Sequence, residues 1–152
     1  MKNDFCDKAT TYATRISECK TIAELEAIGQ EIKVNLKDIY DKQELFITMD
    51  ENATGVSVLA ATEISKVTGN SLIFRYPKET FGALKNPIEG RNVTVITCNN
   101  VNNTTGVISF EIGNSSEIYS KNGCILAVGK SESDLIRVAD RLMLVLLGIM
   151  KP

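Results

Sequence analysis

The chain has 152 residues, of which 43% are hydrophobic and 24% charged, the balance of an ordinary globular protein. Seventeen Lys and Arg against nineteen Asp and Glu give a net charge of −2, which argues against a nucleic-acid or membrane-surface binder because both partners require a basic face. The chain has no histidine, so Ser-His-Asp and Cys-His nucleophile sites and His-based zinc sites are excluded.

Cysteine spacing bears on the redox compartment. The four cysteines, Cys6, Cys19, Cys98 and Cys124, are widely spaced and form no CxxC pair, so we expect reduced thiols in a cytoplasmic protein. Cys98 is interpreted as a small buried hydrophobe. The N-terminus is charged and has no apolar signal segment, so the Asn-x-Ser/Thr sequons are interpreted as accidents of an Asn-rich composition; they begin at Asn52, Asn92, Asn102, Asn103 and Asn114.

The first forty residues favour helices. Apolar residues recur at helical spacing from Phe5 to Ile16. A second helix opens with a capping box at Thr21 and carries an apolar face that extends to Ile32. We expect this N-terminal pair of helices to pack against the rest of the chain.

A βαβ unit is predicted next. The apolar run 45–49 is typical of a buried strand, and a polar loop follows it. Residues 56–68 predict a helix that Gly69-Asn70 ends, and residues 71–75 predict a second strand. Strand, loop, helix and strand at this spacing imply parallel strands.

The middle of the chain is less regular. Residues 76–90 contain two prolines and two glycines and predict a long exposed loop, after which residues 92–98 predict a third strand. Residues 107–121 are ambiguous: their propensity favours a hairpin turning at Gly113-Asn114, whereas the spacing of their apolar residues fits a helix.

The C-terminal part predicts a strand over 124–128 and a helix over 132–150. Residues 142–150 are apolar all round, which indicates either deep burial or a subunit interface, and they are too few to span a bilayer. We expect a single α/β domain with a mostly parallel central sheet flanked by helices. Its parts are the N-terminal helices (1–43), the α/β core (44–131) and the C-terminal helix (132–152).

Two polar loops follow predicted strands and could bind an anion. Thr54-Gly55 precedes a predicted helix, and Thr104-Thr105-Gly106 follows the third predicted strand. Ligands of open α/β sheets bind at the carboxyl ends of the strands, and hydroxyls, backbone N–H groups and helix N-termini favour anions there. We therefore expect both loops at one phosphate-binding edge.

Residues 45–131 resemble the type I phosphoribosyltransferases, most of all the orotate phosphoribosyltransferase branch. The matching segments are ATGV at 53–56, SLIFR at 71–75 with Lys78, PIEGRNV at 87–93 and NNVNNTTG at 99–106. The resemblance implies a cytoplasmic homodimer that binds phosphoribosyl pyrophosphate (PRPP) or a nucleotide, with Mg²⁺ as a possible companion. It also implies a helix after the Thr-Thr-Gly, so a helix is expected over 106–121.

The acidic pair of that family, which contacts the ribose hydroxyls, is missing. It falls on Asn100 and Val101, or on Asn99 and Asn100, and neither asparagine nor valine has a charge to stabilise an oxocarbenium-like transition state. The resemblance therefore implies a ligand-binding protein with reduced or absent catalysis. The alternatives are an active purine or pyrimidine phosphoribosyltransferase and a non-catalytic structural or partner-binding module on the same fold.

The candidate site residues follow from these loops. In an active enzyme Asp50 and Glu51 would hold the metal, because two anions there would repel a pyrophosphate unless Mg²⁺ bridged them. Lys78 and Lys85 are the other catalytic candidates. The expected ligand-binding residues are Thr54, Gly55, Arg75, Asn99, Asn100, Asn102, Asn103, Thr104, Thr105 and Gly106. Direct binding of nucleic acid is not expected, since no basic recognition helix is present.

Overall fold

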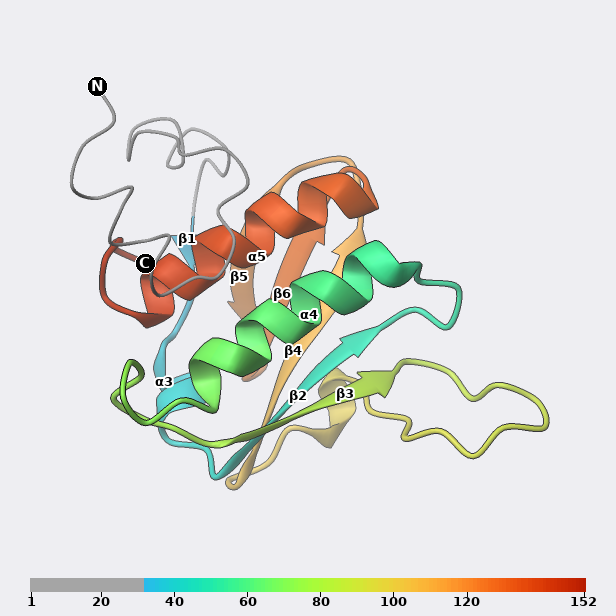
Figure 1. Ribbon diagram of the computed structural model, residues 1–152, viewed down its shortest axis with the longest axis horizontal. Helices are drawn as coiled ribbons and strands as arrows, with labels where there is room; N and C mark the ends of the chain where they lie inside the picture. Colours follow the sequence, from blue (N-terminus) through green and yellow to red (C-terminus); the bar gives the residue numbers. More distant parts are fainter. Residues whose placement is uncertain (1–31) are drawn as a thin grey trace.

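The computed structural model describes residues 32–152 and shows an α/β fold with a six-stranded sheet in the order β1-β5-β6-β4-β2-β3 (Figure 1). The strands are β1 (Ile32–Lys33), β2 (Glu44–Met49), β3 (Glu79–Leu84), β4 (Thr105–Ile112), β5 (Glu117–Lys121) and β6 (Cys124–Gly129). The helices are α3 (Lys37–Tyr40), α4 (Gly55–Thr68) and α5 (Glu132–Leu146), with a 3-10 turn, η1 (Cys98–Asn100).

The sheet is mostly parallel, as predicted. Strands β3, β2, β4 and β6 are parallel neighbours, whereas β5 pairs antiparallel with β6 and parallel with β1. The reversal between β5 and β6 is a two-residue turn in which Asn122 and Gly123 have φ of 52° and 80°. Positive φ at both central residues is the geometry of the hairpin turns that suit the right-handed twist of paired strands.

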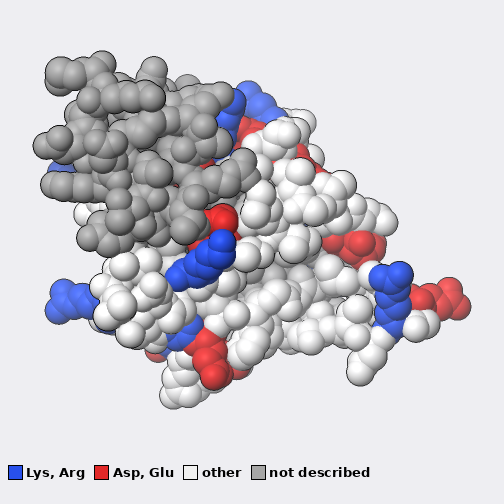
Figure 2. Space-filling model, viewed as in Figure 1, with Lys and Arg blue, Asp and Glu red and all other residues white. Residues whose placement is uncertain are grey.

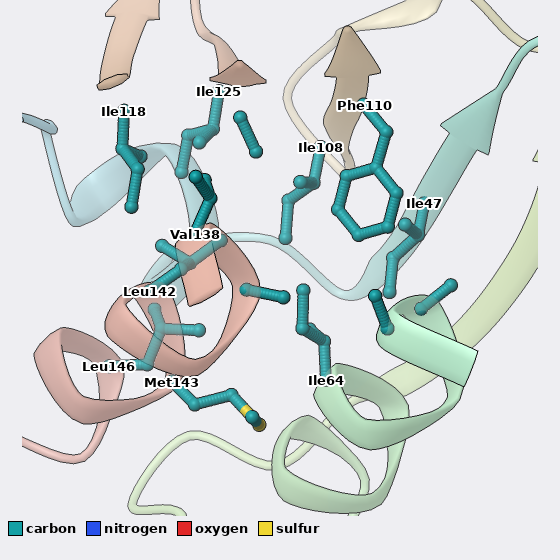
Figure 3. Packing of buried hydrophobic residues seen from close by; sticks show 14 of the residues in the cluster. Ile47, Ile64, Ile108, Phe110, Ile118, Ile125, Val138, Leu142, Met143 and Leu146 are labelled. Carbon is teal, nitrogen blue, oxygen red and sulfur yellow. The ribbon is translucent and has the colours of Figure 1, made fainter. Parts of the chain in front are cut away.

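Helices α4 and α5 lie side by side on one face of the sheet (Figure 1). Alternate strand residues, among them Ile47, Ile108 and Ile125, point from the sheet toward these helices (Figure 3). Val138 and Leu142 of α5 meet them there and are fully or almost fully buried. Each such side chain contributes roughly 1.5–3 kcal/mol through its removal from water, so this layer holds the fold together.

The opposite face of the sheet is crossed by residues 96–98 and the turn η1. The Thr48 hydroxyl of β2 donates to the Ile96 carbonyl at 2.6 Å, and Cys98 forms a disulfide with Cys124 of β6. Both partners in the sheet alternate with core residues, so they point away from α4 and α5. The disulfide shows that the prediction of reduced cysteines, and of Cys98 as a mere buried hydrophobe, is wrong for this pair.

Residues 71–75 are a turn, so the second predicted strand is wrong. The backbone N–H of Phe74 bonds to the Asn70 carbonyl at 2.9 Å, and the Phe74 ring is buried 5.9 Å from the ring of Tyr40. The chain needs these residues to pass from the end of α4 to the sheet. The return strand is β3, inside the stretch that was predicted to be an exposed loop, and it pairs residue for residue with β2.

The predicted strand over 92–98 is also wrong. Its single ladder contact is a bridge between Val95 and Leu84, and the chain then enters η1. Thr97 and Asn100 form a capping box at this turn, which ends the extended run.

The helix expected over 106–121 is wrong as well, because this segment forms β4 and β5. The β-branched and aromatic residues of β4 favour a strand, and the strand is buried on both faces between β2 and β6. The hairpin alternative was right about strands and wrong about their pairing, since β6 lies between β4 and β5.

The prediction for Ile32 near the N-terminus is wrong, whereas the prediction for the apolar C-terminal stretch is confirmed. Ile32, expected on a helix, lies in β1, and the remaining N-terminal helix predictions fall outside the described residues. The apolar C-terminal stretch is buried within the chain, including Leu144 and Met150, which realises the deep-burial alternative. Among residues 32–152, no helix is long and apolar enough to cross a bilayer.

Candidate functional site

The two loops that were expected to form one site lie at opposite edges of the sheet. Thr105, at the start of β4, is paired with Glu44, at the start of β2, so the Thr-Thr-Gly lies at the amino ends of the parallel strands. Thr54 follows the end of β2 and lies at the carboxyl ends. The structure therefore does not bring the two loops together.

At the amino edge, the Thr-Thr-Gly segment is engaged in internal contacts. The Asn102 side-chain oxygen accepts hydrogen bonds from Thr104 and from the Thr105 N–H, and the Thr105 hydroxyl donates to Glu44 at 2.6 Å. A Cβ on Gly106 would lie 2.9 Å from the Asp38 carbonyl oxygen. These residues thus fasten α3 and the start of β4 to β2.

Lys78 also lies at this edge, just before β3, and its contacts are with the backbone of the protein itself. Only 7% of the residue is exposed, and its ammonium donates to the carbonyls of Ile39, Tyr40 and Lys42, the last two at 3.2 and 3.0 Å. Burial lowers the pKa of Lys78 below its ordinary value, and the charge of nearby Asp41 opposes that shift. The side chain ties α3 to the sheet.

At the carboxyl edge, the N-terminus of α4 already holds an anion. Thr54 caps the helix, and its backbone N–H donates to both carboxylate oxygens of Glu132 at 3.2 Å, while its hydroxyl donates to the same group. The hydrogen bond from the Thr54 hydroxyl is the main reason that the pKa of Glu132 lies below its ordinary value, and Ser57 adds to it. Gly55 begins the helix beside this contact.

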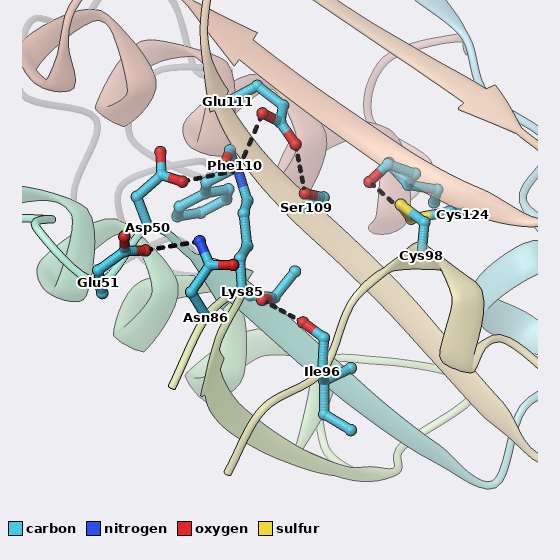
Figure 4. Close-up of polar contacts among 12 residues, drawn as sticks. Asp50, Glu51, Lys85, Asn86, Ile96, Cys98, Ser109, Phe110, Glu111 and Cys124 are labelled. Carbon is cyan, nitrogen blue, oxygen red and sulfur yellow. Dashed lines mark hydrogen bonds and ion pairs between the residues drawn. A yellow bond between two sulfur atoms is a disulfide. The ribbon is translucent and has the colours of Figure 1, made fainter. Parts of the chain in front are cut away.

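Lys85 is at the centre of a polar network at the same edge (Figure 4). Its ammonium lies 2.9 Å from Glu111 and 3.5 Å from Asp50, and it also donates to the Phe110 carbonyl. Glu51 is turned toward Asn86, which donates to it at 2.9 Å and lowers its pKa. Asp50 and Glu51 thus have different partners, and a Mg²⁺ ion held by these two carboxylates stays a prediction.

A pocket of about 150 Å³ opens beside this network, between the ends of β2 and β4 and the first turns of α4 and α5. Its floor is apolar, with Met49, Phe110 and Leu135, and the half-exposed Ile112 stands at its mouth. Its polar lining consists of Asp50, Asn52, Ser57 and Glu132. From β2 the chain continues to β3 at one edge of the sheet, whereas from β4 it continues to β5 toward the other edge. Ligands of open α/β sheets bind at the carboxyl ends of two neighbouring strands whose connections diverge in this way.

The remaining expected ligand-binding residues lie elsewhere. Arg75 is in the turn after α4, with its guanidinium 5.5 Å from the centre of the Tyr76 ring. Asn99 and Asn100 belong to η1, and Asn103 is exposed in the loop that leads to β4. Within residues 32–152, no three potential ligands among His, Cys, Asp and Glu gather around a metal position.

Sequence reasoning did not assign a role to Glu132, Ser57 or Glu111. A helix start was predicted at Glu132, and an acidic residue in a first turn is a common stabilising feature. Nothing in the sequence indicated that this carboxylate contacts a second helix 78 positions earlier in the chain.

Comparisons with protein-family models, curated proteins and solved structures found no match. The phosphoribosyltransferase relationship therefore stays a prediction from the sequence alone.

Proposed function

We propose that the protein is a non-catalytic binding module whose carboxyl-edge pocket takes a small group that is cationic at one end and apolar at the other. The observation that carries this proposal is that one pocket has both two carboxylates, Asp50 and Glu132, and an apolar floor. Acidic side chains, with a basic one beside them, stand at this end of the molecule, at the right of Figure 2.

The charge balance favours a cation over an anion. Glu132 takes the Thr54 N–H and hydroxyl that a phosphate would need. Lys85 is engaged by Glu111 and Asp50. Three carboxylates, those of Asp50, Glu111 and Glu132, outnumber the single ammonium of Lys85 around the pocket. This excess of negative charge repels an incoming anion and attracts an alkylammonium group.

The pocket suits a group of about four carbon atoms with one charge, since an apolar cavity of about 150 Å³ holds a molecule the size of benzene. The test is an NMR titration of the amide signals of the pocket residues with n-butylammonium, using n-butanol as the uncharged ligand of the same shape. We expect n-butylammonium to bind at least tenfold more tightly. Equal affinity for the two ligands, or no shifts at the pocket, would contradict the proposal.

Variants locate the effect. Asp50→Asn removes one carboxylate of the pocket and should weaken n-butylammonium binding about tenfold. Glu79→Gln removes an equal charge from an exposed residue of β3 and should leave binding unchanged. Equal weakening by both variants would mean that only the net charge of the protein matters.

A phosphoribosyl ligand is the second candidate, and one observation favours it: the N-terminus of α4 binds a carboxylate, so a phosphate that displaced Glu132 would find the same donors. Glu132→Ala separates the two candidates because the expected effects have opposite signs. It should weaken n-butylammonium binding, and it should strengthen binding of PRPP, tested with and without Mg²⁺. Release of pyrophosphate from PRPP in the presence of a base would show the active-enzyme alternative instead.

A further inference from the structure

Sequons are more frequent in this chain than composition predicts. Ser and Thr make up 23 of the 152 residues, and the chain has twelve asparagines. By chance, about two of these asparagines would have a Ser or Thr at the second position after them. Five asparagines have this arrangement, and all five are exposed in the structure. An Asn-x-Ser/Thr site in a surface loop is the acceptor for N-glycosylation of exported proteins.

The disulfide is a second, independent observation that indicates the same kind of compartment. Cys98 and Cys124 are 26 positions apart and are joined across the sheet face opposite α4 and α5. Structural disulfides persist in oxidising compartments and are rare where thiols are kept reduced. N-glycosylation also takes place outside the reducing cytosol, so one export step would account for both features.

Among the five sequons, the one at Asn92 is distinguished by its contacts. Asn92 and Thr94 are both exposed, and within residues 32–152 neither side chain forms a hydrogen bond. They follow a turn in which the Arg91 N–H bonds to the Ile88 carbonyl at 3.1 Å and Gly90 has φ of 75°. This segment extends away from the sheet at the right of Figure 1.

Each of the other sequons has a polar group in use. Asn102 accepts three hydrogen bonds with its side-chain oxygen. The hydroxyl that completes the sequon of Asn103 donates to Glu44, that of Asn52 to Glu132, and that of Asn114 to Asp134. At Asn102 the side-chain nitrogen that would carry a glycan also donates to the Asn100 carbonyl at 3.4 Å, and in the other three sequons the recognition hydroxyl is already engaged.

We propose that Asn92 is an N-glycosylation site, used when the chain passes through an oxidising, glycosylating compartment. The co-substrate is an oligosaccharide carried by a polyprenyl phosphate or pyrophosphate. The Asn92 Nδ2 forms a bond to the anomeric carbon of the first sugar and loses a proton, while the bond between that carbon and the phosphate oxygen of the lipid carrier breaks. No electrons are transferred in this step.

The test is expression of the full chain behind a secretory signal in a yeast or mammalian host, followed by intact and peptide mass spectrometry of the protein from medium and microsomes together. We expect the mass of at least one oligosaccharide, removable by peptide N-glycosidase, with the highest occupancy at Asn92. Asn92→Gln and Thr94→Ala should each abolish that modification, whereas Thr94→Ser and Val93→Ala should keep it. All these variants are at exposed or half-exposed positions, so folding should be preserved.

Two results would overturn the proposal. The first is a microsomal or secreted chain with the Cys98–Cys124 disulfide formed and Asn92 unmodified. The second is higher occupancy at Asn102 than at Asn92, because it would mean that the contacts in the folded structure do not govern which acceptor carries the glycan.

Discussion

Glu132, the first residue of α5, accepts hydrogen bonds at 3.2 Å from the backbone N–H of Thr54, the residue that caps α4. One carboxylate thus serves the positive ends of two helix dipoles, its own and that of the neighbouring helix. This contact fixes the carboxyl-edge loop over the pocket and fills the position at which an anionic ligand was expected.

The contact predicts a pH-dependent stability. The pKa of Glu132 lies below its ordinary value of 4.5 in the folded protein, so its contribution is complete above that value and is lost as the pH falls through the lower, folded-state pKa. Glu132→Gln should therefore lower the thermal midpoint by a constant amount above about pH 5, and this difference should shrink below pH 4.5. Thermal unfolding from pH 3 to pH 7 measures it.

Glu79→Gln serves as the control for that series, because Glu79 is an exposed residue at the start of β3. Its midpoint should follow that of the natural sequence at every pH. A difference between Glu132→Gln and the natural sequence that stays the same from pH 7 to pH 3 would show that the carboxylate charge has no part in the contact.

Replacing Lys78 should cause a large loss of stability and no specific loss of ligand binding. Lys78→Met leaves the carbonyls of Ile39, Tyr40 and Lys42 without this donor in a buried position. We expect a loss of about 2 kcal/mol in the free energy of unfolding, measured by urea denaturation. Lys130→Met, at an exposed position, should change it by less than about 0.5 kcal/mol. Equal values for the two variants would refute the structural role of Lys78.

We expect that Gly106, the glycine of the Thr-Thr-Gly segment, is needed for packing. In Gly106→Ala the new methyl group would lie 2.9 Å from the Asp38 carbonyl oxygen and 3.0 Å from the Lys42 side chain. Such overpacking costs about 1–3 kcal/mol. Gly82→Ala is the matched control, because it also lies in a strand and its methyl group would meet nothing within 4 Å. If Gly106→Ala unfolds at the same urea concentration as Gly82→Ala, the close approach of α3 to β4 is not as described.

The sequence determined the elements whose patterns are local. The capped helices α4 and α5 and the apolar strands β2 and β6 lie within a few residues of their predicted bounds. In each of them the apolar spacing, the N-cap hydroxyl or the turn residues satisfy the backbone and the core without help from distant segments. The α/β class and the mostly parallel sheet followed from these elements.

The tertiary structure alone decided which of the remaining segments became strands. Residues 71–75 are more apolar than β3, yet β3 is the strand because it reaches the open edge of β2 and the earlier run is used to leave α4. Residues 107–121 fitted a helix by spacing, but β4 is hydrogen-bonded to β2 on one side and to β6 on the other, and β5 extends the sheet beyond β6.

The candidate site depended on the same long-range choices. The Thr-Thr-Gly lies at the amino edge because β4 begins there, and Glu132 meets Thr54 because α5 packs beside α4. A sequence specifies a contact between distant residues only through the packing of whole elements, so hydroxyls, glycines and carboxylates could be recognised locally while their partners could not.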